Sequence, residues 1–146
     1  MNGCTARHHV NRCAVSDRNG EAAFYENRNP ISASLLREKA ERRTLRRVSR
    51  VPLLRLDDYA ARHAISAVHV LKLDVEGVEL DALRGAEQIL ATVRLLFLEV
   101  HPPFSTFGQV RVLLDRAGLH CVAPIPLPSE QAQANCIFIR QPNVGS

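Results

Sequence analysis

The chain has 146 residues, of which 46% are hydrophobic and 23% charged, and its formal net charge is +4. This length favours one domain, residues 1–146, with a real core, and the composition excludes wholesale disorder. No apolar run approaches the roughly 18 residues of a membrane span, and the N-terminus lacks the hydrophobic core of a signal peptide. We therefore expect a soluble, cytoplasmic protein that makes no membrane contact.

The N-terminal segment predicts two short strands joined by a turn. A buried strand is expected over His8 to Val15, ending at Ser16 and Asp17, and Asn19-Gly20 is a strong turn signal. Ala22 to Tyr25 would be the return strand. The loop-like segment 27–34 follows.

The cysteines show no CxxC pair and no dense framework, which makes a disulfide scaffold or a standard zinc module unexpected. The four are Cys4, Cys13, Cys121 and Cys136. Cys4, His8, His9 and Cys13 form a small group of soft ligands, but their spacing matches no common metal motif. We expect reduced structural thiols and a plain strand at this group.

The one charge run of the chain lies between Arg37 and Arg50. Its basic residues, interrupted only by Glu38 and Glu41, are Arg37, Lys39, Arg42, Arg43, Arg46, Arg47 and Arg50. Such a run can neutralise phosphates, as a nucleic-acid-binding module does. It has no interleaved aromatics, however, and its glutamates are spaced for helix-surface pairs. A solvated or acceptor-facing basic helix is the favoured prediction.

The central segment predicts a strand that ends in carboxylates and then becomes a helix. A short strand over Val51 to Leu56 leads into a helix over Asp58 to His63, with Asp57 or Asp58 as its N-cap. The stretch Val68 to Leu83 then carries an apolar strand that ends at Asp74 and Glu76. Ligands of open α/β sheets bind at such carboxyl ends of strands.

A second strand of the same kind, Leu95 to Val100, ends in Glu99 and His101. The segment between the two strands, Val78 to Val93, has apolar positions at helical spacing and contains Gly85. Strand, helix and strand form a βαβ unit, which places both carboxyl ends at one edge of a parallel sheet. Four ionisable side chains are therefore expected to converge there.

The C-terminal third predicts one helix and two strands. Phe107 to Ala117 is amphipathic and ends at Gly118, a natural C-cap. Strands are expected over His120 to Ala123 and Cys136 to Arg140, joined by the proline-rich segment 124–128.

The phrase KLDVEGVELDALRGAEQIL resembles the signature of the FkbM family of S-adenosylmethionine-dependent methyltransferases. Other segments fall in the order that this family shows: AVSDRNGEAAFY, SASLL, VPLLRLDDYA, LFLEVHP and ANCIFIR. The resemblance covers nearly the whole chain. It implies an α/β fold with a Rossmann-like class I methyltransferase sheet, S-adenosylmethionine as cofactor, and O-methylation of a hydroxyl on a sugar, glycan or polyketide-type small molecule.

The sequence departs from the family pattern at its N-terminal end. Family members begin with a strand, a glycine-rich loop and a second strand with an acidic end, and this sequence contains no GxG. The resemblance therefore implies an N-terminally truncated domain without the first two strands, the C-terminal part of an enzyme. Those missing pieces would supply the close backbone approach to the cofactor.

The resemblance also implies roles for particular residues. Asp74 takes the position near cofactor and acceptor, Glu76 stands beside it, and Glu99 and His101 line the acceptor side, with Glu76 or His101 as the base. Ser16 and Asp17 would contact the adenine edge of the cofactor. The plainer alternatives are a structural ion pair between Glu76 and Lys72, a loop cap by His101, and a simple turn at Ser16.

The same carboxylates can hold a magnesium-like ion, but nothing in their spacing demands one, and the sequence predicts no metal ligands. The expected partner is a small-molecule or glycan acceptor with a hydroxyl group. Nucleic acid is not expected, and the sequence does not indicate an oligomeric state. The rival hypothesis is a non-catalytic methyltransferase-like fragment that acts by association with another chain.

Overall fold

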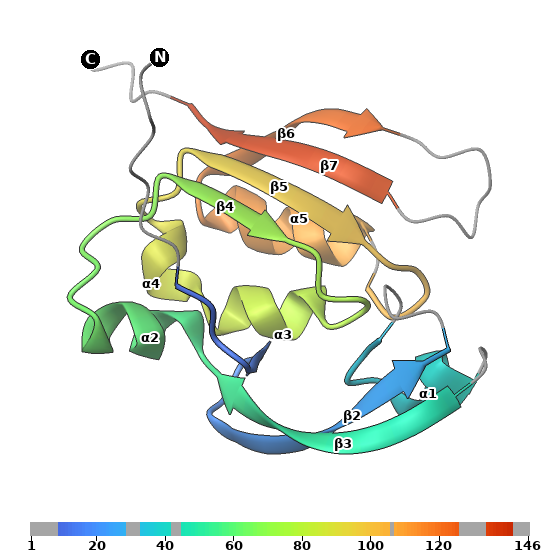
Figure 1. The fold of residues 1–146 in the computed structure, drawn as a ribbon. Coiled ribbons are helices and arrows are strands. Elements are labelled where there is room, and N and C mark those ends of the chain that lie inside the picture. The colour runs from blue at the N-terminus through green and yellow to red at the C-terminus, as the bar shows by residue number, and fades with distance from the viewer. Residues whose placement is uncertain (1–8, 29–32, 42–44, 106, 126–133, 142–146) are drawn as a thin grey trace, which may run out of the picture.

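The fold is α/β, with two mixed sheets and a group of short helices (Figure 1). The computed structural model describes residues 9–28, 33–41, 45–105, 107–125 and 134–141. The strands are β1 (Ala14–Val15), β2 (Gly20–Asn27), β3 (Leu45–Leu54), β4 (Val70–Leu73), β5 (Leu95–Val100), β6 (Leu119–Ile125) and β7 (Ala134–Arg140). The helices are α1 (Arg37–Glu41), α2 (Leu56–Arg62), α3 (Glu79–Arg84), α4 (Glu87–Leu90) and α5 (Phe107–Arg116).

The larger sheet has the strand order β4-β5-β7-β6. β4 and β5 run parallel, with Leu73 opposite Leu98, whereas β7 is antiparallel to both β5 and β6. The chain from β4 to β5 therefore forms the predicted βαβ unit. Because the two strands are parallel and in register, the residues that follow Leu73 lie beside the end of β5.

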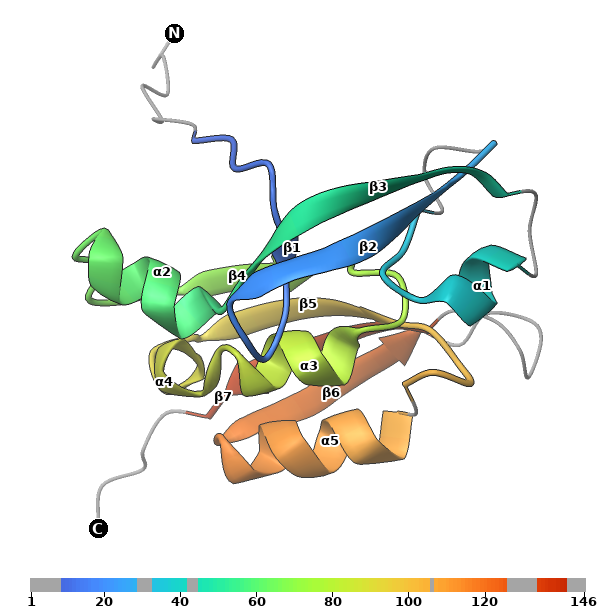
Figure 2. The same cartoon turned by 90° about the horizontal axis from the view of Figure 1, so that it is seen from below.

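One face of the larger sheet packs on helices. Along β5, Leu96, Leu98 and Val100 are buried, while Phe97 on the opposite face is 40% exposed. α3, α4 and α5 lie over the buried face (Figure 2). This alternation is the period-2 pattern of a strand with one face in the core.

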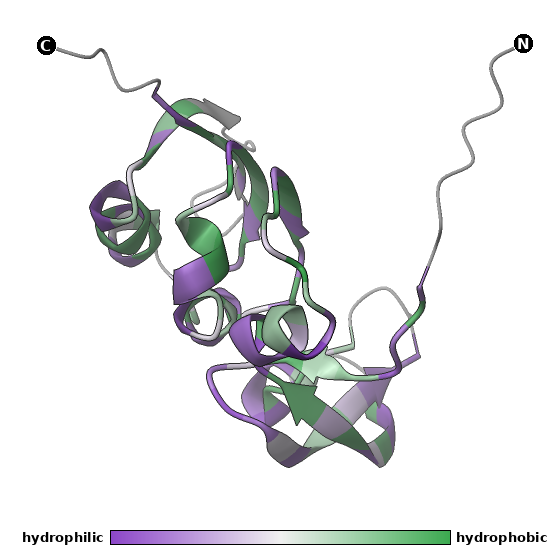
Figure 3. Cartoon of the chain, turned by 90° about the vertical axis from the view of Figure 1, so that its left-hand side faces the viewer, coloured by the Kyte–Doolittle hydropathy of each residue, from purple (hydrophilic) through white to green (hydrophobic). Residues whose placement is uncertain are grey.

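The smaller sheet has the order β1-β3-β2 and corrects the predicted basic helix. Among the described residues of the basic run, only Arg37–Glu41 is helical, and Leu45–Leu54 is a long strand paired antiparallel with β2. Arg47 and Arg50 reach Glu26 and Glu21 across the ladder. In Figure 3, hydrophobic segments dominate the larger sheet, whereas the smaller one mixes hydrophilic and hydrophobic segments.

The helix expected over 78–93 is broken into α3 and α4 at Gly85. A Cβ added at Gly85 would lie 2.0 Å from the backbone oxygen of Ser16. The segment after β1 therefore packs directly against the backbone of Gly85. Gly85 is needed for close approach, and the continuous-helix prediction was wrong.

The predicted N-cap of the helix after β3 is also corrected. α2 begins after Arg55 and has no side-chain cap. Asp57 is instead buried, and its carboxylate accepts hydrogen bonds from the backbone N–H groups of Gln88 and Ile89 at 3.0 to 3.1 Å. Asp57 thus caps the N-terminus of α4, far along the chain.

The remaining elements follow the prediction with shifted bounds. α5 ends before Gly118, which has a φ of +76° as expected for a helix-terminating glycine. The first strand shrinks to Ala14–Val15, and part of its predicted range lies outside the described residues. In the described part of the chain, Cys13, Cys121 and Cys136 are not in disulfides, while Cys4 lies outside it. Among the described helices, none has the length and apolar character to span a membrane.

Candidate active site

The chain turns sharply after β4, and this turn presents Asp74 and Glu76. Asp74 directly follows the strand, while Glu76 and Gly77 have φ values of +56° and +109°. Positive φ at a non-glycine residue is uncommon and clusters at functional sites. The alternation of β4 therefore does not extend to Glu76, whose side chain is placed by the turn.

Lys39 from α1 forms a buried ion pair with Glu76. Its ammonium group contacts Oε2 of Glu76, and the exposed fractions of the two side chains are 8% and 17%. Ser34 ties down the same turn, because its hydroxyl donates to the Glu76 backbone oxygen at 2.7 Å. No pattern in the sequence distinguishes Lys39 from the other basic residues of its run.

His101, at the end of β5, is 3% exposed and is held by Glu79. Nδ1 of His101 lies 2.6 Å from Oε1 of Glu79, which also accepts the Gly77 backbone N–H at 2.8 Å. Burial by itself would raise the pKa of Glu79, but hydrogen bonds from His101, Ser105 and Gly77 together lower it. An ionised Glu79 accepts the Nδ1 proton, so the lone pair of a neutral imidazole is on Nε2.

Two further carboxylates face His101 from the strand ends. Nε2 lies 3.5 Å from Oε2 of Glu76 and 3.7 Å from Oε1 of Glu99. Both distances are too long for hydrogen bonds, and Nε2 has no hydrogen-bond partner among the described residues. Burial, and then the negative charges of Asp74 and Glu76, raise the pKa of Glu99.

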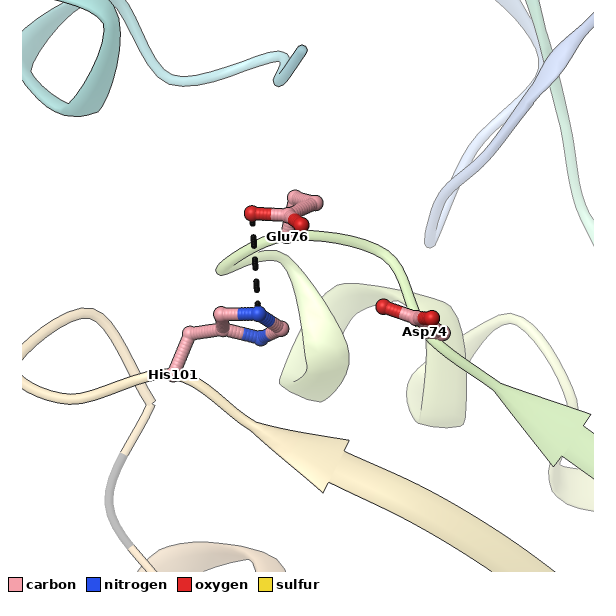
Figure 4. A group of neighbouring side chains, drawn as sticks. All are labelled: Asp74, Glu76 and His101. Carbon is pink, nitrogen blue, oxygen red and sulfur yellow. Dashed lines mark ion pairs between the residues drawn. The ribbon is translucent and has the colours of Figure 1, made fainter. Parts of the chain in front are cut away.

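Asp74, Glu76 and His101 converge as the sequence predicts. One ligand atom from each lies within 4.8 Å of the others, and the three side chains face a common space (Figure 4). Asp74 also pairs with Lys72 at 3.1 Å, on the exposed side. The alternative pair of Glu76 with Lys72 is not formed, because Lys39 contacts Glu76 instead.

A cavity of about 220 Å³ adjoins these carboxylates and lies between the two sheets. Its walls come from β1, β2, the segment 33–35 and the turn after β4, and its lining residues include Val15, Phe24, Ser34, Asp74 and Glu76. A larger cavity of about 710 Å³ lies between α3, α4 and α5 on the helical face. It does not reach the cluster of charged groups, so we place the candidate active site at the smaller cavity.

Ser16 and Asp17 lie at the end of β1. Ser16 is buried, its backbone N–H donates to Leu54 at 3.0 Å, and its hydroxyl donates to Asp17 at 3.2 Å. Asp17 also pairs with Arg18. The residues just before them, Cys13 to Val15, line the cavity, whereas Ser16 itself packs against Gly85. Their contact with a cofactor stays a prediction.

The cluster has two chemical capacities. An imidazole nitrogen with an available lone pair, next to carboxylates, can accept a proton from a hydroxyl group. The same lone pair and carboxylate oxygens can also bind a cation. Glu79 and Lys39, which hold the reactive groups in place, are the residues that the sequence reasoning missed.

The family model described as "Methyltransferase FkbM domain" matches residues 3–121. No curated protein and no solved structure matches the chain.

Proposed function

The chain belongs to the FkbM methyltransferase family, and we propose that it transfers a methyl group from S-adenosylmethionine to a hydroxyl oxygen. The acceptor would be a sugar, a glycan or a polyketide-type small molecule. The observation that carries this proposal is the group of Asp74, Glu76, Glu99 and His101 at the ends of β4 and β5, of which Asp74 and Glu76 line a cavity. The strands of the larger sheet would then be part of a Rossmann-like methyltransferase sheet.

The fit of the donor to this cavity can be judged from size and polarity. About 220 Å³ is below the roughly 300–1,000 Å³ of sites that enclose a drug-sized ligand. The cavity would therefore hold part of the donor, with Asp74 at its polar edge. Ser16 and Asp17, next to the β1 wall, are the proposed contacts for the adenine end.

S-adenosylmethionine supplies a methyl group already activated by a sulfonium centre. The chain's own residues would orient the acceptor oxygen, exclude water and take up the hydroxyl proton as the oxygen–carbon bond forms and the sulfur–carbon bond breaks. Orientation alone can be worth up to roughly 7–11 kcal/mol. Of the two proposed bases, Nε2 of His101 has no hydrogen-bond partner among the described residues, whereas Glu76 is engaged by Lys39.

Calorimetric titration of the chain with S-adenosylmethionine tests the proposal. We expect saturable binding that Asp74→Asn weakens, and methyl transfer to a hydroxylated acceptor that Glu76→Gln reduces. Asp81→Asn is the matched control, because this carboxylate pairs with Arg84 on the surface of α3 at 3.2 Å. Full activity in both site variants would remove Asp74 and Glu76 from the mechanism.

The absence of heat and of any thermal shift on adding the donor would favour the rival hypothesis. The chain would then be a methyltransferase-like domain that acts through association with another protein. Circular dichroism would separate this outcome from a misfolded sample, whose spectrum would lack the α/β signature. Pull-down with the same chain would then test for the associated protein.

A further inference from the structure

We propose that Asp74, Glu76 and His101 bind a divalent first-row transition metal ion. They offer two carboxylates and one imidazole from two adjacent strand ends, with ligand atoms that lie within 4.8 Å of one another (Figure 4). A metal ion about 2.0–2.2 Å from each ligand atom needs ligand atoms at most roughly 4.4 Å apart. Small side-chain rotations therefore suffice to close the site.

The orientation of His101 is the second observation that points to a cation. Its Nδ1 is hydrogen-bonded to the fully buried Glu79 carboxylate at 2.6 Å. Its Nε2 is buried without a hydrogen-bond partner among the described residues. Nε2 also faces two carboxylate oxygens, at 3.5 and 3.7 Å. A lone pair directed at negative oxygens is unfavourable unless a positive charge, carried by a proton or by a metal ion, lies between them.

The pair of Glu79 and His101 has the geometry of a metal-binding histidine and the carboxylate that orients it. Histidines that bind metals almost always donate their other ring N–H to a carboxylate or a carbonyl, which fixes the tautomer and the ring orientation. Glu79 does this here, and its position is fixed in turn by the Gly77 N–H at 2.8 Å.

The local charge balance leaves room for a divalent ion. Four carboxylates, Asp74, Glu76, Glu79 and Glu99, face two ammonium groups, Lys39 and Lys72, so the contacts among the described residues leave two negative charges in excess. Lys39 takes one site on Glu76, but a carboxylate has about four lone-pair sites and can accept a metal as well.

The ligand chemistry selects the class of metal. Magnesium and calcium prefer all-oxygen sets, whereas imidazole suits zinc, iron, cobalt and also manganese when it is mixed with carboxylates. With a metal on Nε2, His101 would no longer be available as base. Glu99 would then be the proton acceptor closest to the metal site that is not itself a ligand. This last role rests on the proposed methyl transfer, whereas the metal site itself does not.

A titration of the chain with Mn²⁺ tests the site without donor or acceptor. Binding is measured as the loss of the electron paramagnetic resonance signal of the free ion. Mn²⁺ is chosen because it does not favour thiolates, which keeps the cysteines out of the measurement. We expect one saturable site, lost in Asp74→Ala and His101→Gln. Glu79→Gln should weaken binding roughly 10- to 100-fold, as expected for an outer-shell partner.

Two controls assign the site. Asp81→Ala removes a surface carboxylate of α3 and should leave Mn²⁺ affinity unchanged. His9→Gln removes an imidazole near the N-terminus and should also bind normally. The proposal is overturned if Mn²⁺ binding does not saturate, if Asp74→Ala retains it, or if only His9→Gln loses it. Asp74 is exposed, so its replacement tests the site even where His101→Gln fails to fold.

Discussion

At the scale of single residues, the buried ion pair of Lys39 and Glu76 has the clearest energetic consequence. The Lys39 side chain is 8% exposed, and its partner sits in a turn with positive φ. Lys39→Met would leave the Glu76 carboxylate, which is 17% exposed, without its counter-charge. Removing one partner of a fully buried pair costs about 3–5 kcal/mol, so for this partly buried pair we expect a loss of at most about 3 kcal/mol in the free energy of unfolding.

Urea denaturation followed by circular dichroism measures this loss. Lys39→Met/Glu76→Gln should recover most of it, because no charge is then left unpaired. Arg37→Gln is the matched control on the same helix: Arg37 pairs with Glu41 in solvent and its loss should have no measurable effect. Equal stability of Lys39→Met and wild type would show that the pair is not formed in solution.

The lowered pKa of Glu79 predicts how stability depends on pH. A carboxylate whose pKa is lower in the folded state than its ordinary value of 4.5 stabilises the protein above that value. This contribution is lost as the pH falls through the folded-state pKa. Glu79→Gln should therefore cost about 1–2 kcal/mol near neutral pH, and less in acid, where the wild-type side chain is itself protonated.

Unfolding free energies of wild type and Glu79→Gln, measured from about pH 6 down to pH 3 in the presence of a chelator, give the comparison. The difference between the two proteins should shrink toward acid pH. A difference that stays constant over this range would contradict the lowered pKa of Glu79.

The sequence could predict the residues at the strand ends but not those that support them. Asp74, Glu76, Glu99 and His101 follow from two apolar strands and the rule for parallel sheets. Lys39 lies in a run of like residues, and its burial depends on how α1 packs beside the turn after β4. That packing is a tertiary contact, and no local sequence pattern predicts it.

At the scale of elements, the break between α3 and α4 depends on Gly85. A Cβ at this position would lie 2.0 Å from the Ser16 backbone oxygen, which is not a group that can rotate away. Gly85→Ala should therefore push the end of β1 from the helices and cost about 3 kcal/mol or more in unfolding free energy.

Gly108 provides the matched control in α5. A Cβ added there meets nothing within 4 Å, so Gly108→Ala should stabilise the protein by about 0.5–1 kcal/mol through helix propensity. Thermal unfolding of both variants tests the contrast. If the two substitutions shift the midpoint of thermal unfolding in the same direction, the backbone of Ser16 does not lie this close to Gly85.

The elements were predicted best where one pattern dominates. Leu95–Val100 matches its predicted bounds because its alternation and its apolar content agree. Residues 45–50 were predicted as part of a basic helix from charge spacing, and only the following segment as a strand, yet the backbone from Leu45 to Leu53 pairs with β2. Helix-surface pairs contribute only about 0.2–0.5 kcal/mol each, so a strand ladder formed with a distant segment overrides them.

At the scale of the whole molecule, the candidate active site exists only because two sheets meet. The cavity takes its walls from β1 and β2 on one side and from the turn after β4 on the other. A donor bound there would contact both sheets. Ala14→Phe, which places a large ring at the β1 wall, should therefore reduce the affinity for S-adenosylmethionine about tenfold or more, equivalent to about 1.4 kcal/mol.

Ala61→Phe is the control, because Ala61 lines a different cavity of about 280 Å³ beside α2. It adds the same ring and should leave donor affinity unchanged. Calorimetry gives the affinities, and urea midpoints establish that both variants are folded. A folded Ala14→Phe that binds the donor as tightly as wild type would mean that the donor does not enter between the two sheets, and the charged cluster at the ends of β4 and β5 would then need another ligand.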